Sequence, residues 1–394
     1  MLDELAATLG GEGPEELRGA AALRLRVRLQ PAAGVGARVM PPTYSGEEGP
    51  VYLREQRRVE DATVPCVLLD SIASQSNRLE EALLALMGAG ELEVPDIEVD
   101  QAEFGTHRAI EFSHRVFDAW VEDALLDGVP FGKTRQYERL ASVINRGVAK
   151  PLVERFPVGL LLGCWASRKH NPQGATRIAR AVTSEMIGYD VLDGQRAASK
   201  VDLQHISREV KLAEEANGGT RFRVVDEKER GAKRPSEFGY GNVTPSAASH
   251  GGVTVGFAEQ QTVISLAALR AVRMGELGQD GATDPATDLV ARRLLALLAI
   301  AMLEAQVELG WDLRSGCQLV PEAEPTLELV SRLGQTVRKA PLAGLGAIEA
   351  LRVAVGEATG IDWTVEPVKL RASPPQLELL RRSLGRPSEE SAEG

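Results

Sequence analysis

The chain has 394 residues, of which 43% are hydrophobic and 26% are charged, as is normal for a soluble protein of one large or two ordinary domains. The longest apolar run, Leu294 to Leu303, is too short to cross a bilayer, which excludes a membrane-spanning helix and predicts a buried one. The net charge of −11 argues mildly against a nucleic-acid partner.

The cysteines lie far apart in the sequence, and none belongs to a C-x-x-C pair: they are Cys66, Cys164 and Cys317. This spacing argues against a zinc site and a disulfide framework and favours a reducing cytoplasm. The acidic N-terminal segment has no signal-peptide charge pattern. The sequence therefore predicts a cytoplasmic protein with no metal, no cofactor and no membrane partner.

Charge is strongly segregated along the chain. Residues 131–180 contain ten basic and two acidic residues, a net charge of +8, whereas residues 79–130 contain thirteen acidic and two basic residues, a net charge of −11. One surface should be strongly positive and another negative. Such a molecule could bind a polyanion on one side or stack head to tail on its own copies.

In chain order, the first predicted element is a strand from Ala21 to Pro31. Leucine and valine alternate with Arg24, Arg26 and Arg28, which predicts a half-buried strand with a basic exposed face. A Gly/Pro-rich loop extends to Gly49.

The segment from Leu68 to Leu86 is predicted to be an amphipathic helix. Its apolar arc contains Leu68, Ile72, Leu79, Leu83 and Leu86, and its opposite arc is polar. Gln75 and Ser76 lie near the edges of the apolar arc, where an unpaired polar group is costly. Either they bond to nearby backbone beside a solvated face, or the face binds phosphate and sugar.

The middle of the chain mixes further helices and strands. We expect an acidic loop or short hairpin over 88–105, a helix over 106–128 and a basic helix within 130–156. The apolar run Pro157 to Ser167 predicts a central strand, followed by a polar loop and a helix that begins near Thr176.

Residues 193–251 are the least regular part, with a possible mobile hairpin over 219–242. Beyond it we expect a strand and the start of a helix over 253–269, a long helix over 286–310, a strand over 313–320, a helix over 342–358, a strand over 362–372, and a short helix before a disordered acidic tail. Without a steady βαβα alternation, the pattern favours an α+β fold.

No strong enzyme motif is present. If residues 106–128 are helical, His107, Glu111, His114 and Asp118 share one face, and Glu-x-x-His is a pattern of di-iron bundles. Such sites need a second copy of the motif, which is absent from the sequence. The alternative is a helix surface with i,i+4 pairs. Cys164, in "GCWAS", is predicted to be a small core residue.

Four stretches together resemble a known family. They are "LREQRRVEDATVPCVLLDSIASQSNRLEEALL", "SHRVFDAWVEDALLDGVPFGK", "LLLGCWASRKHNPQGATRIARAVTSEMIGYDV" and "GYGNVTPSAASHGGVTVGFAEQQTVISLAALR". In this order they resemble the CRISPR-associated RAMP backbone protein of type I-U (I-G) systems, the CRISPR RNA-binding subunit of the Cascade effector complex that is present in several copies.

The resemblance implies a modified RRM (ferredoxin-like) core with inserted finger-like and thumb-like segments. It implies one domain over 1–375, with insertions near 88–156 and 193–251, and a partly disordered tail over 376–394. The implied role is non-catalytic: several copies stack along the spacer part of a CRISPR RNA. The implied partners are that RNA, the target DNA strand reached through the guide, further copies of the protein, and the other subunits of the interference complex.

The resemblance and the residue chemistry together suggest three groups of RNA-binding residues. The palm helix contributes Ser74, Gln75, Asn77 and Arg78; the basic block contributes Arg168, Lys169, Arg177 and Arg180; and the thumb-like segment contributes Lys200, Arg230, Lys233 and Arg234. Because spacer sequence must be ignored, contacts should go to phosphate and sugar. The aromatic content of 4% fits this, since stacking platforms are scarce.

Two alternatives remain open. One is a metal-dependent nuclease that uses His107, Glu111, His114 and Asp118. The other is a protein-only scaffold in which segregated charge serves self-association, with some basic residues pairing with the acidic face of a neighbouring copy.

Overall fold

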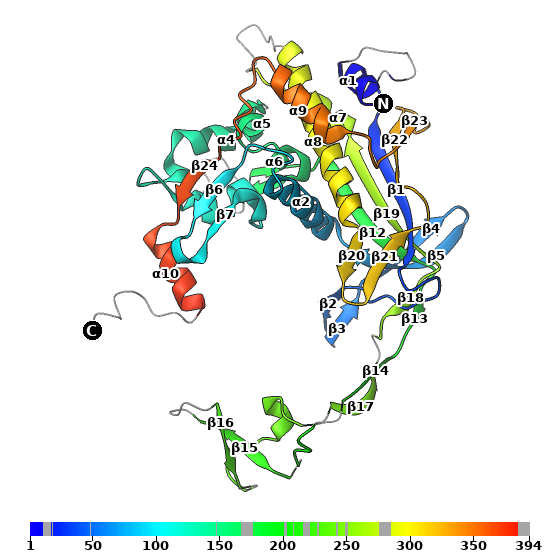
Figure 1. Cartoon of the computed structure of the whole chain (residues 1–394), viewed down its shortest axis with the longest axis vertical. Coiled ribbons are helices and arrows are strands. Elements are labelled where there is room, and N and C mark those ends of the chain that lie inside the picture. Colours follow the sequence, from blue (N-terminus) through cyan, green and yellow to red (C-terminus); the bar gives the residue numbers. More distant parts are fainter. Residues whose placement is uncertain are drawn as a thin grey trace.

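The computed structural model describes most of the chain: residues 1–10, 17, 19–47, 49–146, 148–166, 176–200, 203–207, 209–215, 221–226, 228–241, 243–248, 251–275 and 285–384. Within these residues the fold is mixed α+β, as predicted, and is built on a curled antiparallel sheet (Figure 1). No described helix is long and apolar enough to cross a membrane.

The main sheet has nine strands among the described residues. Along its path the order is β20 (Trp311–Arg314), β21 (Cys317–Pro321), β1 (Ala22–Pro31), β19 (Phe257–Ser265), β12 (Val182–Tyr189), β5 (Ala62–Asp70) and β4 (Arg54–Val59); β22 (Thr326–Val330) also pairs with β1, and β23 (Thr336–Pro341) pairs with β22. The prediction of a half-buried β1 is confirmed, because its leucines and valine are buried, whereas Arg24 and Arg26 pair with Glu328 and Glu259 on the other face.

Two long helices cover one face of this sheet (Figure 1). Helix α2 (Ile72–Gly88) lies in the chain between β1 and β12, and α8 (Pro285–Leu309) lies between β19 and β21. The two helices pack on each other, and Leu294 to Leu303 of α8 are all buried, as predicted. Further helices are α1 (Leu2–Gly10), α7 (Leu266–Arg270), α9 (Ala347–Glu357) and α10 (Pro374–Ser383).

A second sheet joins distant parts of the chain. Its order is β7 (Thr106–Arg108), β6 (Ile97–Asp100), β24 (Val368–Arg371), β8 (Leu125–Leu126) and β9 (Val129–Pro130), with β24 parallel to β6. It stands beside η1 (Ala102–Phe104), η4 (Phe131–Lys133), α4 (Arg135–Arg146) and α5 (Lys150–Arg155). The predicted insertion over 88–156 thus shares its sheet with a C-terminal strand, while the predicted domain division itself stays a prediction.

The described residues between 192 and 254 form an arm that extends away from the rest of the molecule (Figure 1). Its paired strands are β13 (Leu192–Asp193) with β18 (Val253–Thr254), β14 (Arg196–Lys200) with β17 (Val243–Ala248), and β15 (Lys211–Glu214) with β16 (Phe222–Val225), followed by η5 (Pro235–Phe238). The hairpin predicted over 219–242 is wrong in extent, because β16 pairs with the earlier strand β15.

Several predicted elements differ in the structure. Leu68 to Asp70 end strand β5, so the helix begins at Ile72. Residues 106–128 are not one helix but β7, η2 (Ala109–Glu111), η3 (Arg115–Phe117), α3 (Ala119–Glu122) and β8. Arg115 has φ +55° and Asp118 caps α3, and both features interrupt a continuous helix.

The predicted central strand is also wrong. Val158–Leu162 form a short buried helix, α6, and the strand β10 (Cys164–Ala166) follows only after Gly163 at φ +80°. The expected helix near Thr176 is instead β11 (Thr176–Ile178) followed by β12, which lies in the middle of the main sheet. A short, continuous apolar run is compatible with a buried helix as well as with a buried strand, so hydrophobic periodicity could not distinguish the two.

The remaining differences are smaller. The loop expected up to Gly49 contains a hairpin of β2 (Thr43–Gly46) and β3 (Gly49–Tyr52), and the single strand expected over 313–320 is the hairpin of β20 and β21. The strand β19 followed by α7, the helix α9 and the C-terminal helix α10 are confirmed. The acidic tail beyond residue 384 lies outside the described residues.

Candidate nucleic-acid interface

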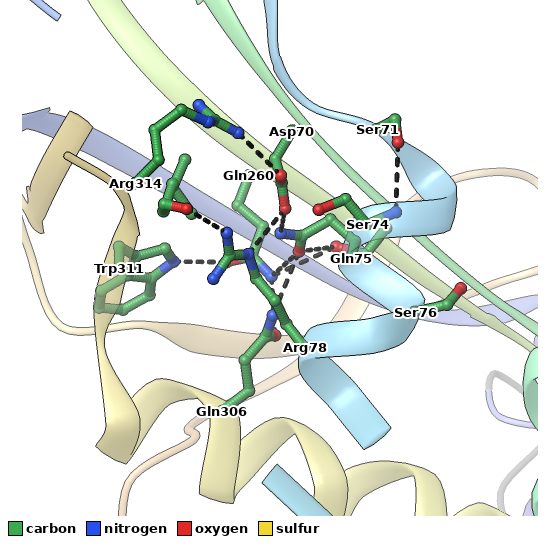
Figure 2. Close-up of polar contacts among 12 residues, drawn as sticks. Asp70, Ser71, Ser74, Gln75, Ser76, Arg78, Gln260, Gln306, Trp311 and Arg314 are labelled. Atoms are coloured by element: carbon green, nitrogen blue, oxygen red, sulfur yellow. Dashed lines mark hydrogen bonds and ion pairs between the residues drawn. The ribbon is translucent and has the colours of Figure 1, made fainter. Parts of the chain in front are cut away.

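The polar face of helix α2 is the start of a buried hydrogen-bond network. Gln75 is 0% exposed, and its side-chain Nε2 donates to Asp70 Oδ2 at 2.5 Å. Its Oε1 accepts from Ser184 Oγ of β12 at 2.9 Å and lies 3.2 Å from the amide nitrogens of both Gln260 and Gln306. Trp311 Nε1 donates to Gln260 at 2.7 Å (Figure 2). The network therefore ties α2 to β12, β19, α8 and β20.

Asp70 is the anionic centre of this network. Arg78 Nε donates to Asp70 Oδ2 at 2.9 Å, and Arg314 Nη2 donates to Oδ1 at 3.2 Å (Figure 2). Arg78 also donates to the carbonyl of Leu313 at 2.7 Å. A carboxylate that is 1% exposed needs such partners, because a buried unpaired charge is strongly unfavourable. The two arginine side chains are 22% and 26% exposed.

The local sequence explains how these groups meet. Strand β5 ends at Asp70, Ser71 caps the helix by accepting from the Ser74 N–H, and Gln75 and Arg78 then follow at a three-residue spacing on one side of α2. Ser76 bonds to the carbonyl of Ile72 and points away from the network (Figure 2).

The predicted palm residues therefore divide into two pairs. Gln75 and Arg78 lie inside the network, whereas Ser74 is half-buried and Asn77 is exposed. Gln75 bonds to the nearby side chain of Asp70 and to Ser184, Gln260 and Gln306, which are distant in sequence. Its side chain therefore neither bonds to nearby backbone nor belongs to a solvated face. RNA contact by any of these four side chains stays a prediction.

A second cluster consists of arginines around Gly163. Arg115, which is buried, pairs with Glu80 of α2 at 2.5 Å and donates to the Gly163 carbonyl at 3.0 Å. A Cβ on Gly163 would lie 3.0 Å from the side chain of Arg180, so the glycine allows Arg180 to pack closely there. Arg177 and Arg180 are both exposed by surface area, in and just after β11.

The charges of this cluster do not balance. Partial burial lowers the pKa of the Arg180 guanidinium, and the nearby positive charges of Arg115 and Arg177 lower it further, with Glu80 as the opposing carboxylate. Burial raises the pKa of the Glu80 carboxyl, against the effect of Arg115. Within the described part of the chain, Glu80 is the carboxylate that acts on Arg180, and it is already paired with Arg115. The exposed surface at Arg177 and Arg180 is therefore suited to an anion.

Sequence reasoning missed Trp165 beside these arginines. Trp165 lies in β10 directly opposite Arg177 in the β10–β11 register and is 49% exposed. The ring of His114 stands perpendicular to the indole, with 5.5 Å between centroids. The available signal was its position within the most basic block, next to Cys164, which is buried as predicted.

The other predicted RNA-binding residues lie elsewhere. Arg168 and Lys169 fall outside the described residues. Lys200 ends β14, and Arg230, Lys233 and Arg234 are exposed on the arm, where Lys233 pairs with Glu214 at 2.8 Å. The arm extends away from α2 (Figure 1), so the structure separates the predicted residues into distinct places and does not form one site.

The alternative of a metal-binding helix face loses its basis, because residues 106–128 do not form one helix. His107 lies in β7 and pairs with Glu111 at 3.3 Å, while Asp118 accepts from the backbone N–H groups of His114 and Trp120. In the described ranges no group of three histidine, cysteine or acidic residues is arranged to hold a metal ion.

Part of the chain matches a known protein family. Residues 23–193 match the model of the family described as CRISPR-associated protein GSU0053. A search of curated proteins finds no match. The matched range includes Asp70, Gln75 and Arg78 and the cluster of Arg115, Trp165, Arg177 and Arg180, and it links this part of the chain to CRISPR systems. The network partners Gln260, Gln306, Trp311 and Arg314 lie outside the matched range.

Proposed function

We propose that this protein is a non-catalytic backbone subunit of a type I CRISPR interference complex, of subtype I-U (I-G). In this role it binds the spacer part of a CRISPR RNA without regard to sequence and stacks in several copies to present it to target DNA. The observation that supports this most is the excess of positive charge at Arg177 and Arg180 within the range that matches a CRISPR-associated family.

The strand order supports an RRM-like core. If β1, β12, β19 and β21 are numbered 1 to 4 along the chain, their order in the sheet is 4-1-3-2, all antiparallel. Helix α2 follows the first of these strands and α8 follows the third, and both cover the same face. A ferredoxin-like domain has the same β-α-β-β-α-β sequence of elements, so this order supports the proposed core, to which β5 and β4 would be added at one edge.

The contacts also suggest separate roles for the predicted residues. Gln75 is fully buried, so it would stabilise the fold without touching the RNA, while Ser74, Asn77 and the exposed part of Arg78 would face the RNA. Arg177 and Arg180 would pair with phosphates, and the arm with Lys200, Arg230, Lys233 and Arg234 would reach a neighbouring copy or the RNA between copies. Phosphate contacts bind without reading sequence.

The first test is to express the protein with a CRISPR array and its neighbouring subunits, purify it, and sequence any RNA that remains bound. Uniform spacer-containing RNA is the expected result. Heterogeneous RNA would contradict the specific CRISPR role, and protein free of nucleic acid at low salt would favour the scaffold alternative. Metal-dependent cleavage of the bound strand would overturn the non-catalytic assignment.

The second test compares a double charge reversal with a matched control. Arg177→Glu/Arg180→Glu should weaken RNA binding and reduce the slope of log K against log salt by about 0.7 for each lost phosphate contact. Arg382→Glu on α10, whose side chain is 80% exposed, reverses a charge remote in sequence and should leave the slope unchanged. Equal losses for both variants would indicate a general charge effect and contradict a site at β11.

A further inference from the structure

The surroundings of Trp165 distinguish it from an ordinary exposed apolar residue. Trp165 is 49% exposed, whereas Trp311 and Trp363 are 6% and 8% exposed. Single exposed apolar side chains are common and need no explanation by themselves. This one, however, adjoins the cluster of Arg115, Arg177 and Arg180, where cations outnumber carboxylates.

The geometry of β10 and β11 places the indole and a guanidinium side by side. Trp165 and Arg177 are direct partners across the two strands, and such partners have Cβ atoms about 5 Å apart. The His114 ring stands at 90° to the indole and limits its orientation. Arg180 follows strand β11 and packs beside Gly163, and Gly163 lies two residues before Trp165 in the chain.

An aromatic face beside exposed arginines, for which the described residues offer no ion-pair partner, fits a single-stranded nucleic acid. Bases stack on aromatic rings whatever their identity, while neighbouring phosphates pair with arginine, and the two together describe sequence-tolerant binding of an unpaired strand. A protein partner with acidic side chains would satisfy the arginines but would leave the indole without a planar group to stack on. A duplex would offer phosphates but no accessible base face.

We propose that Trp165 is a stacking platform for one unpaired base of a bound strand whose adjacent phosphates contact Arg177 and Arg180. This inference rests on the proposed RNA-binding function and adds a base contact to it. Because stacking does not read the base edge, it is compatible with a spacer of any sequence.

The test compares two probes of equal length on the full-length protein. One probe is a 12-nucleotide oligouridylate, and the other is the same ribose–phosphate chain without bases. Dissociation constants are measured by fluorescence anisotropy at one salt concentration, together with quenching of tryptophan emission. The wild-type protein should bind the oligouridylate roughly 10-fold more tightly than the abasic chain, the size expected for one stacked base.

Substitutions at Trp165 test whether the indole causes the preference for the oligouridylate over the abasic chain. Trp165→Ala should bind both probes equally, near the wild-type affinity for the abasic chain, and Trp165→Phe should recover part of the preference. Tyr44→Ala removes another exposed aromatic ring, 37% exposed on β2, and should leave the preference intact. Each variant is first compared with wild type by thermal unfolding, and the Phe variant keeps the test decisive should the Ala variant unfold.

The outcomes separate this inference from the function on which it rests. Equal wild-type affinity for both probes, or a preference that persists in Trp165→Ala, would overturn stacking while leaving phosphate-based RNA binding in place. Binding of neither probe would overturn the proposed function and this inference together.

Discussion

Two polar regions of the molecule differ in how their charged and polar groups are satisfied. Around Gln75, the carboxylate of Asp70, the amides and the guanidinium groups all have partners from the protein itself, and Asp70 accepts from Gln75, Arg78 and Arg314. Around Gly163, Arg115 takes the one carboxylate, and Arg177 and Arg180 face solvent. The difference teaches that a saturated network stabilises the fold, whereas an unsaturated cluster is available to a ligand.

The largest expected effect is at the centre of the saturated network. Asp70→Ala would leave Arg78 and Arg314 beside a cavity, without their carboxylate partner. We expect the free energy of unfolding to fall by about 3 kcal/mol. This value is at the low end for a buried pair because both arginine side chains are partly exposed. Urea unfolding followed by circular dichroism measures it. Glu349→Ala, in an exposed pair with Arg352, should change stability by less than about 0.5 kcal/mol.

A second prediction concerns a buried carboxyl that lacks the partners of Asp70. Burial raises the pKa of Asp96 to about 8, although its Oδ1 accepts from the Ile97 N–H. The folded protein then keeps a proton that the unfolded chain loses near its ordinary value of 3.8, so stability should fall as pH rises from there to about 8. The slope should be roughly 1 kcal/mol per pH unit.

The matching variant is Asp96→Asn, which keeps the size of the side chain and cannot ionise. Its stability should be less sensitive to pH between 5 and 8 than that of the wild type, with the gap between the two proteins widening toward pH 8. If the free energy of unfolding changed with pH to the same extent in both proteins, Asp96 would not be the group responsible.

Gln75→Leu should lower the free energy of unfolding by a smaller amount than Asp70→Ala. The substitution leaves the hydroxyl of Ser184 and the amides of Gln260 and Gln306 without their shared acceptor, at a cost of about 2 kcal/mol. RNA affinity of the folded protein should not change, because Gln75 is 0% exposed. Weaker RNA binding with unchanged stability would break the comparison between the two regions.

The smallest effect on stability is expected in the unsaturated cluster. Arg177→Gln and Arg180→Gln remove like charges that repel each other, so the free energy of unfolding should stay within about 0.5 kcal/mol of wild type. The same variants should weaken RNA binding. A large loss of stability would mean that these arginines belong to the fold and not to a ligand site.

Elements with a clear period were predictable from local sequence. The alternation of β1 follows from side chains that must leave water at every second position, and the burial of α8 follows from its uninterrupted apolar run, Leu294 to Leu303. Residues 106–128 and 157–189 were not predictable in this way. There Arg115 and Gly163 take positive φ, and their apolar neighbours reach the core through short turns and strands rather than one regular element.

The sequence by itself determined that charge is segregated, that Gln75 needs partners, and that 131–180 is the most basic block, because these depend only on residue type and spacing. Only the tertiary structure decided which groups are satisfied. Gln75 meets Ser184, Gln260 and Gln306 from three distant elements, and Trp165 comes to face Arg177 through the pairing of β10 with β11. Such contacts form between segments far apart in the chain, so no local pattern of residues specifies them.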